Sequence, residues 1–404
     1  MSAVLQVIRS KFQVIWKLSL FSFVIAGLTG FLYRYGFFMP LPEWLHLDNI
    51  RHAHSHLMLF NWITPPILVW MAASVVAQGN GQTIRRFKIC LYTMMITGFL
   101  SWPFFLLYGY RAVPIGSASL PVAAMLSGLV MITWYWFAAL YFRVRKTGEA
   151  NSLSLTLFDA ALVALMVSSL GAWGVSVHQF SSLESPLISK ALTSFFLGVF
   201  TEGWLMLGLL GVLWSGMKTD GIGLKVGWLW VPILFGAMLI FPFSLEQSIL
   251  TPLMLYSAKA GLLLIIVALS IHLFGLMRTP FAASGIGSVI LLLLVLKILF
   301  LAGALLPTGI WPAEHGLRIL YLHLVLLGFG STGLIVAFYP DTQKVVKWSY
   351  VVAMTTVLIT LGMFSGYWPR NFIPQHLVYW LAGAALLPVL PVAWVLADFK
   401  TWHF

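Results

Sequence analysis

Long apolar stretches separated by short polar connections run through the whole chain. A helix needs about 20 apolar residues to cross a bilayer, and twelve stretches approach or exceed that length. Their predicted bounds are 16–38, 54–78, 87–109, 119–142, 153–177, 186–214, 223–244, 250–276, 285–307, 316–339, 346–368 and 374–397. The connections are too short for an extramembrane domain. The pattern predicts an all-α, polytopic membrane bundle of about twelve transmembrane helices, with residues 1–404 as one transmembrane domain.

Composition agrees with a membrane protein. The chain is 60% hydrophobic and 8% charged, whereas soluble domains average about 25% charged residues. The net charge of +12 does not indicate nucleic-acid binding, because the basic residues fall in short loops between apolar stretches. The expected partner is therefore the lipid bilayer. The single cysteine, Cys90, excludes an internal disulfide, a covalent c-type haem and a cysteine-based zinc site.

The basic residues also predict orientation. Fifteen lysines and arginines lie in the N-terminal tail and in the loops after even-numbered spans, whereas six lie on the other side. Positive residues stay on the cytoplasmic side, so both termini are predicted to be cytoplasmic. Most histidines then fall in outer loops or the outer halves of spans: His46, His52, His54, His56, His178, His315, His323 and His376.

The second span opens with a cluster of histidines, Arg51-His52-Ala53-His54-Ser55-His56. At 100° per residue, His52 and His56 share one face and His54 looks away from it. His54 continues into a stripe with Met58, Asn61 and Pro65. The polar Asn61 favours a stripe that faces the bundle interior. The face of His52 and His56 is expected to meet lipid or apolar neighbours.

The tenth span contains Tyr321-Leu322-His323, followed by a glycine-rich stretch. We expect His323 to need a partner, because an unsatisfied polar group in hydrocarbon is costly. Small residues also serve ordinary helix packing. Considered together, however, His54 and His323 place two outer-leaflet imidazoles on separate helices, an arrangement that could ligate a haem iron from opposite faces.

At these motifs the chain resembles subunit I of the haem–copper oxidases and the related nitric oxide reductases. The segment His54-Ser-His-Leu-Met58-Leu-Phe60 is similar to the helix-two segment of that family, and Tyr321-Leu-His323 to its helix-ten His-x-His. Trp368-Pro369-Arg370-Asn371 resembles the loop that contacts the haem propionates. The resemblance implies a low-spin haem b held by His54 and His323, with Arg370 at the propionates. It also implies a bacterial inner-membrane location and respiratory partner subunits or a cytochrome electron donor.

The chain departs from the family at the oxygen- or NO-reducing centre. Gly198 stands at the position of the helix-six histidine before Glu202-Gly203, and the seventh span has no histidine. We therefore expect no copper and no binuclear centre, so that electron transfer or NO and redox sensing is the implied role. Tyr321 replaces the histidine that holds the second haem in the family, and tyrosinate can itself ligate haem iron.

Four charged residues lie within predicted spans: Asp159, Glu202, Lys259 and Lys297. Charged residues in spans are functional candidates, and Glu202 with Lys259 is expected to form either a proton route or a structural ion pair. This leaves two alternatives to a haem protein. One is a proton-coupled transporter that uses Glu202, Lys259 and Asp159. The other is a non-haem metalloprotein that uses His52, His56, His315 and His376.

Overall fold

The computed structural model describes residues 3–76, 81–145, 152–179, 181, 185–215, 217, 228–245, 249–306, 314–339 and 344–397. Within these ranges, eleven helices are long and apolar enough to cross a membrane. The seventh predicted stretch is represented by a shorter apolar helix, Trp230–Phe243, and its first residues lie outside the described ranges. The prediction of an all-α polytopic bundle is confirmed, and the chain is an integral, multi-pass membrane protein.

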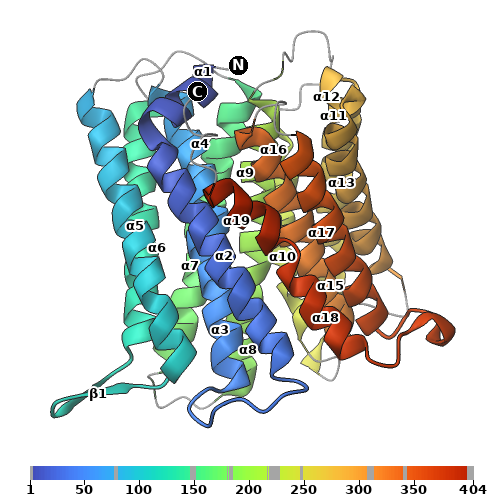
Figure 1. Cartoon of the computed structure of the whole chain (residues 1–404). Helices are drawn as coiled ribbons and strands as arrows, with labels where there is room; N and C mark the ends of the chain where they lie inside the picture. The colour runs from blue at the N-terminus through green and yellow to red at the C-terminus, as the bar shows by residue number, and fades with distance from the viewer. Residues whose placement is uncertain are drawn as a thin grey trace. The chain divides into compact units, whose positions relative to one another are not determined.

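The helices cluster in two compact units, of which unit 1 comprises residues 1–148 and 339–404. Its first described element is α1 and its last is α19, and its only described strands form one hairpin (Figure 1). The elements of unit 1 are α1 (Ala3–Val7), η1 (Ile8–Phe12), α2 (Gln13–Tyr35), α3 (Leu47–Leu57), η2 (Met58–Ile63), α4 (Thr64–Val76), α5 (Gly81–Tyr108), β1 (Val113–Ile115), β2 (Ala118–Leu120), α6 (Val122–Arg145), α17 (Lys344–Phe364), η9 (Arg370–Phe372), α18 (Leu377–Leu386) and α19 (Val389–Ala397).

Unit 2 comprises residues 149–338. Its elements are α7 (Leu153–Gln179), α8 (Pro186–Gly198), η3 (Val199–Leu205), α9 (Met206–Trp214), α10 (Trp230–Leu239), η5 (Phe241–Ser244), α11 (Pro252–Met277), α12 (Pro280–Ala283), α13 (Gly285–Gly303), α15 (His315–His323), η7 (Leu324–Ser331) and α16 (Thr332–Phe338). Proline begins α8, α11 and α12, where its fixed φ suits the first turn and its missing N–H removes no helical hydrogen bond. Local sequence therefore sets these helix starts.

One span in each unit is far more enclosed by protein than the others. The most apolar window of Leu47–Val76 in unit 1 is 89% buried, and that of Pro186–Trp214 in unit 2 is 83% buried; the next most buried span reaches 67%. These two spans are therefore the ones most enclosed by protein among the described residues. They carry His54 and Glu202, so two of the predicted site residues lie on the most enclosed helices.

Several spans change from α-helix to π-helix, in which the backbone N–H groups bond five residues back. The described π-helical segments are η1, η2, η3 and η7. Hydroxyl groups satisfy carbonyls near three of them: Thr64 donates to Leu59 at 2.7 Å, Ser331 to Leu326 at 2.8 Å and Thr201 to Leu197 at 2.7 Å. Because π-helical turns concentrate at functional sites, η2, η3 and η7 direct attention to the residues that adjoin them.

The connection between α5 and α6 contains a small hairpin that the sequence did not predict. Strands β1 and β2 pair antiparallel, with Val113 opposite Leu120 and Ile115 opposite Ala118. The turn contains Gly116 at φ +62°, a left-handed conformation that glycine adopts without strain. In Figure 1 the hairpin lies at the end of unit 1 opposite α1. Its residues are exposed apart from Val113.

Candidate functional site

The His54 ring lies against α2. Its Nδ1 is 2.7 Å from the Ala26 carbonyl oxygen, so Nδ1–H donates to that carbonyl and the lone pair of the neutral ring is on Nε2. A Cβ at Gly30 would approach within 2.9 Å of the ring, so glycine is what leaves room for the imidazole. No hydrogen-bond partner of Nε2 is found among the described residues. Histidines that ligate metals commonly donate a hydrogen bond of this kind from the ring nitrogen that does not bind the metal.

His56 points to different neighbours from His54. Its Nε2 is 2.9 Å from the Tyr110 hydroxyl, its Nδ1 is 3.5 Å from the Ser127 hydroxyl, and its ring stacks on Phe105 at 3.9 Å. The His52 ring makes an edge contact with Tyr110 at 4.8 Å between centroids. The face of His52 and His56 thus packs against the protein and has a polar partner, Tyr110, that helical periodicity did not reveal.

Replacing Tyr110 by phenylalanine is expected to destabilise the protein by about 1 kcal/mol, the usual contribution of one hydrogen bond. Burial raises the pKa of Tyr110 from 10.0 to about 12, so the phenol is a neutral donor at physiological pH. A raised pKa in the folded state means that this stabilisation is complete below pH 10 and declines as pH rises towards 12. Chemical unfolding across this pH range measures it. Tyr108→Phe is the matched control, because no hydrogen bond of the Tyr108 hydroxyl is found in the described chain; equal losses in both variants would contradict the expectation.

His323 is the last residue of α15 and directly precedes η7. Its Nδ1 is 2.8 Å from the Ile319 carbonyl oxygen of the same helix. As at His54, this geometry places the proton on Nδ1 and leaves the lone pair of the neutral ring on Nε2. The two histidines predicted as haem ligands therefore share one tautomer, each set by a backbone carbonyl. His323 directly precedes η7, and His54 lies four residues before the start of η2.

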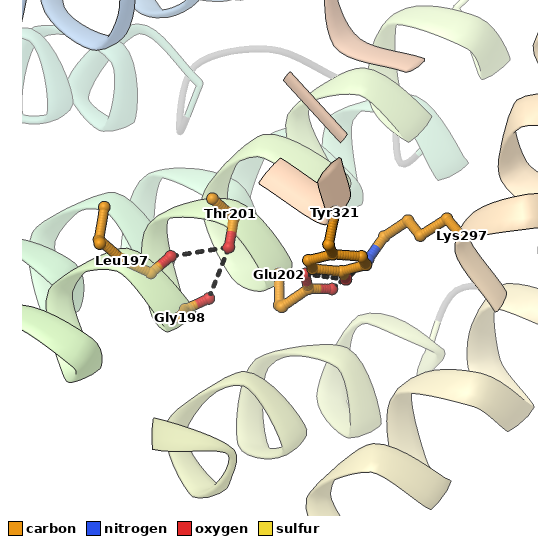
Figure 2. Close-up of polar contacts among 6 residues, drawn as sticks. All are labelled: Leu197, Gly198, Thr201, Glu202, Lys297 and Tyr321. Carbon is orange, nitrogen blue, oxygen red and sulfur yellow. Dashed lines mark hydrogen bonds and ion pairs between the residues drawn. The ribbon is translucent and has the colours of Figure 1, made fainter. Parts of the chain in front are cut away.

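Unit 2 contains a buried triad of Glu202, Lys297 and Tyr321. Figure 2 shows the three side chains converging from η3, α13 and α15. Lys297 forms an ion pair with Glu202 and donates to the Tyr321 hydroxyl at 2.7 Å, while Tyr321 donates to the other carboxylate oxygen of Glu202. Side-chain exposure is 1% for Glu202 and 0% for Lys297. Each side chain thus forms a hydrogen bond or ion pair with the other two, and a buried charge pair requires such partners.

The structure corrects one predicted pairing. Glu202 pairs with Lys297 and not with Lys259, which is half-buried on α11. Tyr321 donates to Glu202, so its hydroxyl belongs to the triad. Asp159 lies in α7 within unit 2, and His315 begins α15 with its side chain exposed. Arg370 begins η9 and is also exposed.

One buried histidine was not among the predicted sites. His272 in α11 is 0% exposed, and its Nδ1 accepts a hydrogen bond from Trp214 at 3.2 Å. This bond places the proton on Nε2, for which no partner is found among the described residues. Among all the described residues, no group of three or more histidine, cysteine, aspartate or glutamate side chains is arranged to hold a metal ion.

Comparison with known proteins gives no family for this chain. No protein-family model and no curated protein matches it. The resemblance to the oxidases stays an expectation, supported by its motifs alone.

Proposed function

We propose that the protein is a membrane haem b protein in which His54 and His323 are the two axial ligands. The observation that supports this proposal is that the two imidazole rings have the same hydrogen bond and the same tautomer. Each imidazole has Nδ1 bonded to a backbone carbonyl, which holds the ring orientation and favours Nε2 as the ligand atom. His54 belongs to unit 1 and His323 to unit 2.

The bound haem would supply one-electron transfer, and two histidine ligands would make it low-spin. The chain's own residues have simpler tasks. Ala26 and Gly30 orient and accommodate the His54 ring, and the Ile319 carbonyl orients His323. We propose a role in electron transfer or in NO and redox sensing, in a bacterial inner membrane, beside a cytochrome donor or respiratory partner subunits.

The purified protein is expected to contain about one equivalent of haem b and copper far below one equivalent. Copper chemistry needs several nitrogen ligands around one ion, and Gly198 stands where the family has its helix-six histidine. The absorption spectrum with a pyridine haemochrome assay measures the haem, and elemental analysis measures the copper. A colourless protein from haem-supplemented cells would overturn the function. Stoichiometric copper with oxygen consumption would instead overturn the electron-transfer role.

A proton-coupled transporter is the second candidate, and the triad favours it. Charged side chains within spans mark ion and proton pathways, and Tyr321, Glu202 and Lys297 form a closed set of proton donors and acceptors. Proteoliposomes with a trapped pH dye would detect substrate-driven proton movement. If the protein is the transporter, it is expected to be colourless, and Glu202→Gln is expected to stop the proton movement. A haem absorption spectrum would instead favour the haem protein. No observation favours the non-haem metalloprotein.

A further inference from the structure

We propose that Arg34 binds a carboxylate group of the haem whose iron His54 ligates, an inference that rests on the function proposed above. Arg34 lies in the last turn of α2 and is 8% exposed. The sequence resemblance assigned the haem carboxylates to Arg370, whose side chain is exposed. The structure therefore provides a buried cation to which the sequence motifs assigned no role.

Arg34 shares a helix face with the residues that hold His54. Ala26, Gly30 and Arg34 follow one another at intervals of four residues, which places them on one face of α2 about 6 Å apart along its axis. The His54 ring contacts the first two of these positions. Arg34 lies one turn further along the same face of α2. A group ligated by His54 would therefore have a guanidinium beside it.

The guanidinium has no anionic partner in the described part of unit 1. Its contacts are the rings of Tyr33 and Phe364, at 5.6 Å and 5.7 Å from the guanidinium carbon. The described acidic residues of unit 1 are Glu43, which is exposed, and Asp48, which pairs with Arg51 at 3.1 Å. Hence neither of them neutralises Arg34.

A buried charge needs more than these rings provide. Cation–π contacts and the dipole at the last turn of a helix each stabilise a cation only modestly. Removing an ion from water costs more than these contacts return, even after relaxation. The guanidinium also has five N–H donors in a planar fork that matches a carboxylate. An anion with two oxygen acceptors is the ligand that meets both requirements.

Phe364 links this site to the connection that carries Arg370. It is the last residue of α17, and Arg370 follows six residues later at the start of η9. Because the Arg34 guanidinium lies over the Phe364 ring, the buried and the exposed arginine belong to the same end of unit 1. We therefore infer a primary contact at Arg34, with Arg370 as an outer and weaker one.

The test uses the full-length protein in nanodiscs of phosphatidylcholine and compares wild type, Arg34→Gln, Arg34→Lys and Arg111→Gln. Loss of a charged hydrogen bond is expected to weaken haem retention about tenfold or more in Arg34→Gln. The midpoint potential should fall, because a positive charge favours the reduced haem. It should also become pH-dependent near neutrality, because the carboxylate loses the cation that keeps it ionised. Arg34→Lys should retain part of each property. Arg111 is an exposed arginine in the connection after α5, and its variant should match wild type.

The outcomes separate the two proposals. A wild-type protein without haem overturns the proposed function and this inference with it. A haem-loaded Arg34→Gln protein with unchanged retention and potential overturns this inference alone. If Arg34→Gln does not fold, the pH dependence of the potential in Arg34→Lys decides, and a profile identical to wild type overturns the inference.

A lipid phosphate is the other source of a suitable anion. A haem-free His54→Ala protein in phosphatidylglycerol and phosphatidylcholine nanodiscs distinguishes it. If phosphatidylglycerol raises thermal stability only when Arg34 is present, the occupant is a lipid headgroup and the haem assignment is wrong. Equal stability in both lipids, with or without Arg34, supports the haem carboxylate.

Discussion

Replacing either His54 or His323 by alanine is expected to abolish the low-spin haem spectrum, whereas His52→Ala and His56→Ala should leave it largely intact. The reason is the environment of each ring. His54 has Nδ1 bonded to Ala26, and His323 has Nδ1 bonded to Ile319. On the same helix as His54, His56 has neighbours at both ring nitrogens, Tyr110 and Ser127, whereas no partner of the His54 Nε2 is found among the described residues. The reduced α-band and the haem-to-protein ratio are the measurements.

The His56→Ala protein also serves as the folding control for this series. It removes an imidazole from the same helix and loses a stacking contact with Phe105, so some loss of stability is expected without loss of haem. A protein that loses its haem on His56→Ala and retains it on His54→Ala would show that the ligand on this helix has been assigned to the wrong face.

Breaking the buried triad is expected to be the most destabilising change in unit 2. Glu202→Gln leaves the Lys297 charge buried without its counterion, and Lys297→Met does the same to Glu202. Removal of one partner of a buried ion pair costs about 3–5 kcal/mol. The double variant Glu202→Gln, Lys297→Met removes both charges and should recover much of that loss. Unfolding of the purified protein in detergent measures all three.

The control for the triad is Lys259→Met, which removes a half-buried lysine of the same unit that does not pair with Glu202. It should change stability by much less than Lys297→Met. Losses that simply add in the double variant would mean that Glu202 and Lys297 do not interact in the folded protein. A stable double variant that loses proton movement would show that the triad has a function beyond stability.

The membrane fold could be predicted from the sequence because each span is encoded within its own 20 or so residues. What lay beyond prediction depends on contacts between distant segments. The pairing of Glu202 with Lys297 follows from the packing of η3, α13 and α15, and periodicity along one span carries no information about it. The contact of His56 with Tyr110 joins a helix to a loop 54 positions later.

The π-helical segments were likewise invisible to a search for a period of 3.6 residues. The stripe of His54, Met58, Asn61 and Pro65 assumes an α-helix throughout, but η2 occupies Met58–Ile63. Even so, Asn61 is fully buried and donates to the Met95 carbonyl at 2.8 Å. A polar side chain within an apolar span thus indicated an interior position even where the helical geometry differed.

The β1–β2 hairpin gives this protein a convenient site for attaching a probe. Its turn, Gly116 and Ser117, is exposed, and exposed loop tips tolerate added residues. The only native thiol, that of Cys90, is buried in α5. A cysteine introduced at Ser117 would therefore be the one readily accessible thiol, and a membrane-impermeant maleimide applied to intact cells would report on which side of the membrane the hairpin lies.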